Sequence, residues 1–156
     1  MLQMVLLIDR GEDLREVNTQ EGRFRMWTLS RHVYASELVG HMMDAHVDLL
    51  LEYGEERVRR REGKLSVFHE WTKMTGYTPS CRARITSWTL DNREAYSEVH
   101  VAFRSKLVAM GVQVANLALG GMIRSYSETG ALQVALRAAM LADNRGSVPS
   151  VAPRKG

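Results

Sequence analysis

The sequence predicts a single α/β domain, in which an opening antiparallel hairpin is followed by strand–helix units that form a mainly parallel sheet with helices packed on it. Stretches with the two-residue period of strands alternate along the chain with stretches that have the spacing of helices. Right-handed crossovers between such units place successive strands side by side and parallel. The 156 residues, 45% of them hydrophobic and 25% charged, suit one globular domain with its own core.

The hairpin is expected at the start of the domain. Leu14–Thr19 has the character of a strand, and Gln20–Gly22 forms the turn. In the segment that follows, residues 23–33, Phe24 and Met26 alternate with arginines, which is typical of a strand with one face in the core. Residues 1–13 are expected to form an N-terminal arm or an extra strand, and the sequence leaves these alternatives open.

The remaining elements follow in order. Apolar residues at helical spacing predict a helix over Ala35–Tyr53, which Gly54 would end. The same patterns then predict strands at Leu65–Trp71, Val99–Arg104 and Met122–Tyr126, and helices at Pro79–Tyr96, Lys106–Leu119 and Thr129–Leu141. Residues 143–156 lack large apolar side chains and are expected to be a disordered tail, so the domain would span residues 14–142.

This order of elements resembles the STAS domain family, named for sulfate transporters and anti-sigma-factor antagonists, and in particular its bacterial STAS/SEC14-like branch. The resemblance is clearest over Leu65–Ala139, which includes "VHVAFRSKLVAMGVQVANLALGG" and "MIRSYSETGALQVAL". It covers roughly residues 14–142 and depends on element order and hydrophobic texture. It implies a STAS-like fold and a regulatory or protein-interaction role, while its SEC14 side implies a domain that binds a small ligand or lipid.

The resemblance also implies a phosphorylation site. In anti-sigma-factor antagonists the partner kinase phosphorylates a serine at the start of a helix, and the nearest matching positions here are Thr78 and Ser80. The sequence departs from the family's pattern, because no Asp precedes either hydroxyl, Pro79 lies between them and Gly76 comes before them. The residues themselves favour an N-cap, in which the Thr78 hydroxyl accepts from the amide of Ser80 or Cys81 and proline occupies the first helical position.

The predicted helix Lys106–Leu119 is apolar nearly all round, although a helix on one side of a sheet should be amphipathic. One interpretation is a central helix that its neighbours in the monomer cover. The other is an interface with a second copy or another protein, with Gln113 and Asn116 pairing across it. The residues of this candidate interface are Met110, Gln113, Val114, Asn116 and Leu117.

A ligand site, if the domain binds one, is expected at the carboxyl ends of the parallel strands, where open α/β sheets bind ligands. The candidate pocket residues are His69, Trp71, Tyr77 and Arg104.

Motifs for catalysis and metal binding are absent from the sequence. No GxSxG elbow, HExxH motif, CxxC pair or phosphate-binding glycine loop occurs, and the single cysteine, Cys81, is expected to be a small core residue. We therefore expect no enzyme activity, no metal site and no cofactor.

The expected partners are proteins. The basic stretch Arg57–Lys64 is interpreted as a solvated connection, so nucleic acid is not an expected partner. The longest apolar run, Leu107–Leu119, is too short to cross a membrane. A single cysteine fits a reducing compartment. We expect a cytoplasmic, non-enzymatic interaction or regulatory module that self-associates into a homo-oligomer, with a small-ligand or lipid-binding domain as the alternative.

Overall fold

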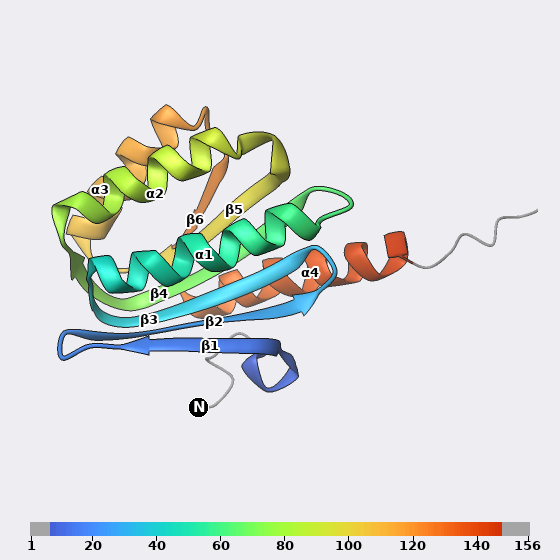
Figure 1. Ribbon diagram of the computed structural model, residues 1–156, viewed down its shortest axis with the longest axis horizontal. Helices are drawn as coiled ribbons and strands as arrows, with labels where there is room; N and C mark the ends of the chain where they lie inside the picture. The colour runs from blue at the N-terminus through green and yellow to red at the C-terminus, as the bar shows by residue number, and fades with distance from the viewer. Residues whose placement is uncertain (1–6, 148–156) are drawn as a thin grey trace, which may run out of the picture.

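The computed structural model describes residues 7–147, which form one mixed sheet with helices on both faces (Figure 1). The strands are β1 (Glu12–Asn18), β2 (Gly22–Ser30), β3 (Val33–Met42), β4 (Leu65–Tyr77), β5 (Tyr96–Phe103) and β6 (Ile123–Tyr126). The helices are α1 (Asp44–Arg60), α2 (Pro79–Asp91), α3 (Lys106–Ala118) and α4 (Thr129–Ser147), with short 3-10 turns η2 (Ile8–Arg10) and η3 (Arg93–Ala95).

The strands lie in the sheet in the same order as in the chain, from β1 at one edge to β6 at the other. β1 pairs antiparallel with β2 and β2 pairs antiparallel with β3, whereas β3, β4, β5 and β6 are parallel to one another. The predicted α/β fold class, its opening hairpin and its parallel sheet are therefore confirmed.

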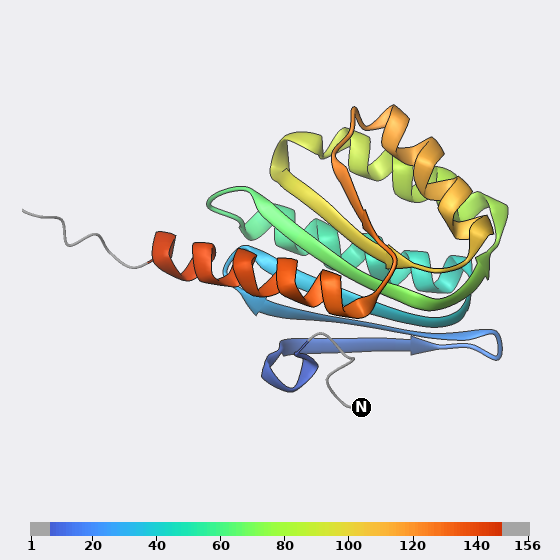
Figure 2. The same cartoon turned by 180° about the vertical axis from the view of Figure 1, so that it is seen from behind.

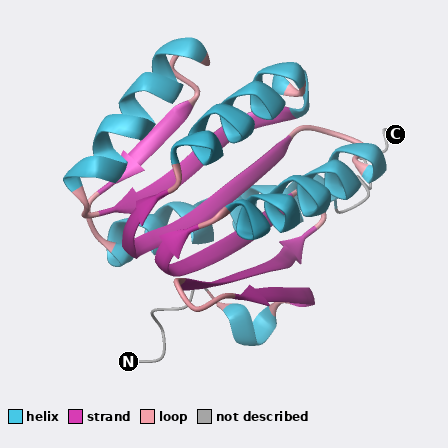
Figure 3. Ribbon diagram, turned by 60° about the vertical axis from the view of Figure 1, so that its left-hand side comes forward, coloured by secondary structure: helices cyan, strands magenta, loops and turns pink. Residues whose placement is uncertain are grey.

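Helices α1, α2 and α3 cover one face of the sheet, and α4 crosses the other face alone (Figures 1 and 2). Figure 3 shows the sheet twisting between these two layers. The larger core lies under α1, α2 and α3 and includes Phe24, Leu38, Tyr53 and Val67. A smaller core under α4 centres on Trp27, Phe68, Leu132 and Leu136.

Strand β3 is the main element that the sequence prediction missed. The predicted helix began at Ala35, but residues 33–42 form a strand and the helix begins only at Asp44. This strand lies between β2 and β4, and residues 33–38 are buried on both of its faces, so it shows no alternation of polar and apolar residues. A short apolar run of this kind cannot be assigned to a strand or a helix by periodicity alone.

Helix α1 also continues past the glycine that was expected to end it. A Cβ atom at Gly54 would lie 2.8 Å from the ring of Trp88, so the glycine serves the close packing of α1 on α2. The helix runs on to Arg60, which places half of the basic stretch Arg57–Lys64 in its last turn.

Several element ends differ from the prediction. β4 extends to Tyr77, because its second half pairs with the end of the missed strand β3. α2 ends at Asp91 and β5 begins at Tyr96. Part of the expected N-terminal arm, residues 8–13, forms η2 and the start of β1, while residues 1–6 lie outside the described residues.

The C-terminal helix α4 runs to Ser147, five residues into the range 143–156 that was expected to be a disordered tail. The carboxylate of Asp143 explains the extra turn. It accepts hydrogen bonds from the Ser30 hydroxyl at 2.7 Å and from the backbone amide of His32 at 2.8 Å, which tie the helix to the β2–β3 connection. Residues 148–156 of the expected tail lie outside the described residues.

Candidate functional site

A cavity of about 100 Å³ lies between the sheet and the three helices on its larger core side. β3, β4 and β5 line its floor with residues such as Tyr34, Val67 and Val101, and α1, α2 and α3 enclose it from above. Most of the lining is aliphatic or aromatic, and Arg82 is its one charged residue. The cavity therefore suits an apolar occupant.

One polar group of the lining is a buried histidine held by a serine and a tryptophan. Ser36 Oγ lies 2.6 Å from His69 Nδ1, and Trp71 Nε1 donates to the same oxygen at 3.1 Å. The rings of His69 and Trp71 are stacked, with centroids 4.5 Å apart. These contacts fix the orientation of the imidazole, whose Nε2 has no hydrogen-bond partner among residues 7–147.

Burial, with a smaller contribution from the nearby His100, lowers the pKa of His69 to about 3. The imidazole is therefore neutral at physiological pH, because the apolar surroundings penalise its charged form. A neutral imidazole has one nitrogen that donates and one that accepts. His69 can thus form a hydrogen bond with an uncharged ligand without bringing a charge into the cavity.

Two threonines of α2 line the cavity, and only one of the two hydroxyls has a hydrogen-bond partner. Thr89 donates its hydroxyl to the Ile85 carbonyl at 2.8 Å, the bond that threonines inside helices usually form. The hydroxyl of Thr86 is buried and has no partner among the described residues. An unpaired buried hydroxyl is costly. The Thr86 oxygen has almost no accessible surface, so it gains a partner inside the cavity only if the side chain turns toward it.

The structure places three of the four predicted pocket residues at this cavity. His69, Trp71 and Tyr77 line it, but Arg104 does not. The Arg104 side chain is exposed after the end of β5, and its Nε donates to the Ser127 carbonyl at 3.4 Å. Sequence reasoning missed Ser36 and Thr86, because the first lies in the unpredicted strand and the second is an ordinary polar residue within a helix.

Helix α3 has two different sides. Val108 and Gly111 are buried toward the cavity. The outer side exposes four apolar residues, with exposed fractions of 51% for Leu107, 63% for Met110, 50% for Val114 and 84% for Leu117. We call these four residues the α3 seam. The interpretation that neighbouring elements cover this helix within the monomer is therefore wrong.

The two polar residues of the candidate interface lie differently from each other. Gln113 is exposed on α3 beside the seam. Asn116 instead bonds the backbone of Ile123 in the edge strand β6, accepting from its amide at 2.8 Å and donating to its carbonyl at 3.3 Å. The prediction that Asn116 pairs across an interface is therefore wrong, because its amide holds β6 to α3.

Thr78 occupies the N-cap position of α2, as predicted, but its side chain forms no capping hydrogen bond. Its hydroxyl lies 3.4 Å from His41 Nε2 and donates to Met43 Sδ at 3.6 Å. The predicted capping bond is thus wrong, because the hydroxyl turns toward the β3–α1 connection.

Ser80, the other candidate phosphosite, is exposed and donates to both oxygens of Asp44 at 3.2 Å. Arg84 bonds the same carboxylate at 3.0 Å. A phosphate on Ser80 would therefore meet the negative charge of Asp44 as well as the positive charge of Arg84. Phosphorylation at Thr78 or Ser80 stays a prediction.

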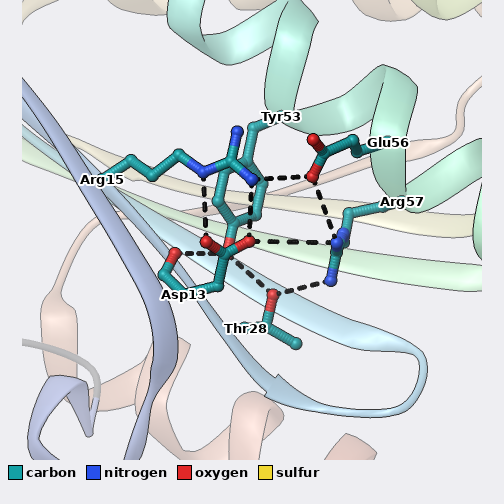
Figure 4. Close-up of polar contacts among 6 residues, drawn as sticks. All are labelled: Asp13, Arg15, Thr28, Tyr53, Glu56 and Arg57. Carbon is teal, nitrogen blue, oxygen red and sulfur yellow. Dashed lines mark hydrogen bonds and ion pairs between the residues drawn. The ribbon is translucent and has the colours of Figure 1, made fainter.

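A polar cluster outside the cavity joins β1 and β2 to α1 (Figure 4). It consists of Asp13, Arg15, Thr28, Tyr53, Glu56 and Arg57. The Tyr53 hydroxyl donates to the Asp13 carbonyl at 3.0 Å and lies 2.7 Å from Thr28 Oγ1, so Thr28 donates to Tyr53. Arg57 in turn donates to Thr28 Oγ1 at 3.2 Å. This chain of bonds ends on a backbone carbonyl.

The charges of this cluster are also paired. Arg15 bonds Asp13 at 3.0 Å and Glu56 at 2.7 Å. The guanidinium groups of Arg15 and Arg57 both lie over the Tyr53 ring. Burial, the largest effect, raises the pKa of Tyr53, so its hydroxyl stays protonated. Apart from Arg57 Nε, which has no partner among the described residues, the polar groups are engaged, and the cluster fastens the edge strand β1 to α1. No local motif marks it, because its residues come from three elements.

The structure also describes the cysteine, the potential metal ligands and the helices that the sequence analysis considered. Cys81 is fully buried, and burial raises the pKa of its thiol. Within residues 7–147, no three His, Cys, Asp or Glu side chains gather in a way that could hold a metal ion. None of the described helices is long and apolar enough to span a membrane.

Comparison with known proteins gives a likeness in fold. No family model matches the chain, and no curated protein sequence matches it. Among solved structures, it is similar to the crystal structure of an uncharacterized protein of the DUF3478 family, with a SpoIIAA-like fold, from Shewanella loihica PV-4. The TM-score is 0.54 at 12% sequence identity, over 79% of this chain and 91% of the other. The chain therefore has the SpoIIAA-like, or STAS-like, fold that its sequence predicts.

Proposed function

We propose that this domain is a non-enzymatic protein-interaction module that pairs with a second copy of itself through the α3 seam. The observation that carries the proposal is the spacing of the four exposed residues. Leu107, Met110, Val114 and Leu117 follow intervals of three, four and three residues, the spacing of the a and d positions in helices that pack against each other.

The chemistry of α3 favours a second copy as the occupant. Lys106 is the only charged residue in the helix, so nothing in the seam repels another copy and nothing in it complements a charged partner. Ala118 is exposed beside the seam, and its small side chain lets another helix approach closely.

The seam is short, which limits the expected affinity. A helix of 13 residues is about 20 Å long, so the contact is smaller than the roughly 800 Å² per partner of a standard interface. We therefore expect a weak dimer that depends on concentration, of the kind that suits a regulatory module in the cytoplasm.

The pair of residues that most resembles a catalytic dyad, Ser36 and His69, supports the non-enzymatic part of the proposal. Ser36 and His69 lie at the distance of a nucleophile and its base, but Ser36 has no exposed surface and is not part of the cavity lining. A substrate atom bound in the cavity would not reach its hydroxyl.

Sedimentation velocity of the full chain tests the proposal. The weight-average mass should rise from that of a monomer toward that of a dimer as the concentration increases. A monomer mass at every concentration up to the millimolar range would overturn it.

A second function, the binding of a small ligand, is supported by the cavity under α3. Its lining includes three residues that the sequence singled out for a ligand site, His69, Trp71 and Tyr77. The two functions are compatible, because α3 turns its inner side to the cavity and its outer side to the solvent.

A further inference from the structure

The hydrogen bonds around Ser36 determine which nitrogen of His69 carries the proton. Trp71 Nε1 can only donate, so the Ser36 oxygen accepts from it. If His69 Nδ1 also donated to that oxygen, the Ser36 hydrogen would be buried without an acceptor among the contacts of the described residues. Ser36 therefore donates to Nδ1, and the proton of the neutral imidazole is on Nε2.

The lining of the cavity thus includes His69, whose Nε2 is an N–H donor, and Thr86, whose hydroxyl has no partner among the described residues and almost no accessible surface. Several other polar groups of the lining are already paired. The hydroxyls of Tyr34 and Tyr96 bond each other at 2.6 Å. The remaining unpaired groups, Tyr77 and Arg82, are only half-buried and so keep access to water.

We propose that the cavity binds a small, uncharged, apolar molecule with one oxygen, which accepts the hydrogen bond of His69 Nε2 and pairs with the Thr86 hydroxyl once this side chain turns toward the cavity. This inference rests on the second proposed function and names its ligand class. Ser36 is a positioning residue, because it fixes the tautomer of His69 without lining the cavity.

The size and lining of the cavity define the class further. An apolar cavity of about 150 Å³ holds benzene, so one of about 100 Å³ holds a small ring or a short chain. An ion inside this lining would lose its hydration, and the one charged lining residue, Arg82, is only half-buried and keeps its own access to water. The ligand class is therefore that of small ketones, aldehydes and alcohols.

The test uses three probes of similar size on the full chain. Cyclopentanone carries the acceptor oxygen, methylenecyclopentane replaces this oxygen by a CH₂ group, and cyclopentanecarboxylate adds a negative charge. NMR titration gives the affinity of each probe and follows the imidazole signals of His69.

Two variants on α2 provide a matched pair. Thr86→Val removes the unpaired hydroxyl, and Thr89→Val removes a hydroxyl that is already bonded to the Ile85 carbonyl. We expect Thr86→Val to weaken cyclopentanone binding about tenfold relative to methylenecyclopentane, and Thr89→Val to leave this ratio unchanged. The ¹⁵N shifts should show a protonated Nε2 in the free protein. The NMR signal of the Nε2 proton should shift when the ketone binds.

The outcomes separate the ligand class from the function itself. If both uncharged probes bind and Thr86→Val leaves their ratio unchanged, or if Nδ1 carries the proton, the polar recognition is wrong but ligand binding stands. If the carboxylate binds most tightly, the uncharged class is wrong and Arg82 becomes the recognition residue. If no probe shifts the signals of cavity residues, the second proposed function itself is overturned.

Discussion

Replacing Leu117 by arginine should abolish self-association while leaving the fold intact. Leu117 is 84% exposed, and full burial of a leucine contributes about 1.5–3 kcal/mol, so its burial in a dimer contributes about 2 kcal/mol per copy. A symmetric dimer would lose about 4 kcal/mol, or roughly three orders of magnitude in Kd, before any repulsion between the new charges. The monomer should change by no more than about 0.5 kcal/mol in its free energy of unfolding, because the side chain is exposed.

Sedimentation velocity over a concentration series measures the dimer, and urea unfolding at low concentration measures the monomer. Val134→Arg is the matched control, since Val134 is 71% exposed on α4, on the opposite face of the sheet. It should leave the dimer unchanged. A Leu117→Arg protein that dimerises like the wild type would refute the reasoning, and so would a Val134→Arg protein that becomes equally monomeric.

The remaining predictions concern the stability of the chain. Burial lowers the pKa of His69 from 6.5 to about 3, so between these values the unfolded chain binds the extra proton. The free energy of unfolding should thus fall as the pH drops through this window, by up to roughly 4–5 kcal/mol, and His69→Phe should flatten this dependence in urea titrations. Thr86→Val should raise the free energy of unfolding by about 1 kcal/mol, because it removes an unpaired buried hydroxyl, and a lower value would contradict this assignment. Asn116→Ala should lower it by about 1–2 kcal/mol and speed amide exchange at Ile123, whereas unchanged exchange there would mean that Asn116 does not hold β6.

The sequence was sufficient to predict the elements whose ends carry local signals. Pro79 begins α2 and Gly120 and Gly121, both with positive φ, follow α3, as their conformational preferences predict. Strand β3 carries no such signal, because a strand between two neighbours and buried on both faces loses the alternation that marks strands. The assignment of residues 35–42 to a helix follows from this loss.

For the candidate sites too, local sequence signals identified some residues and not others. The rule that ligands bind at the carboxyl ends of parallel strands selected His69 and Trp71, which do line the cavity. The rule gave no orientation for Arg104 beyond the end of β5, and it could not identify Ser36 or Thr86, whose importance depends on contacts between distant parts of the chain.

The sequence left open whether α3 is covered within the monomer or exposed. A helix that is apolar nearly all round must expose part of this surface unless other elements surround it. Met110, Val114 and Leu117 were named for the interface alternative, and the structure shows all three exposed. The role of Asn116 depends on its two bonds to β6, which the spacing of residues within the helix does not reveal.

The most direct test of the proposed function is a dilution series of the ¹⁵N-labelled wild-type chain, followed by NMR. If the α3 seam is the dimer contact, the amide signals that shift with concentration should belong to Leu107–Leu117, with those of α4 unchanged. Signals that stay constant from micromolar to millimolar concentration, or shifts confined to α4 or β1, would contradict self-association through α3.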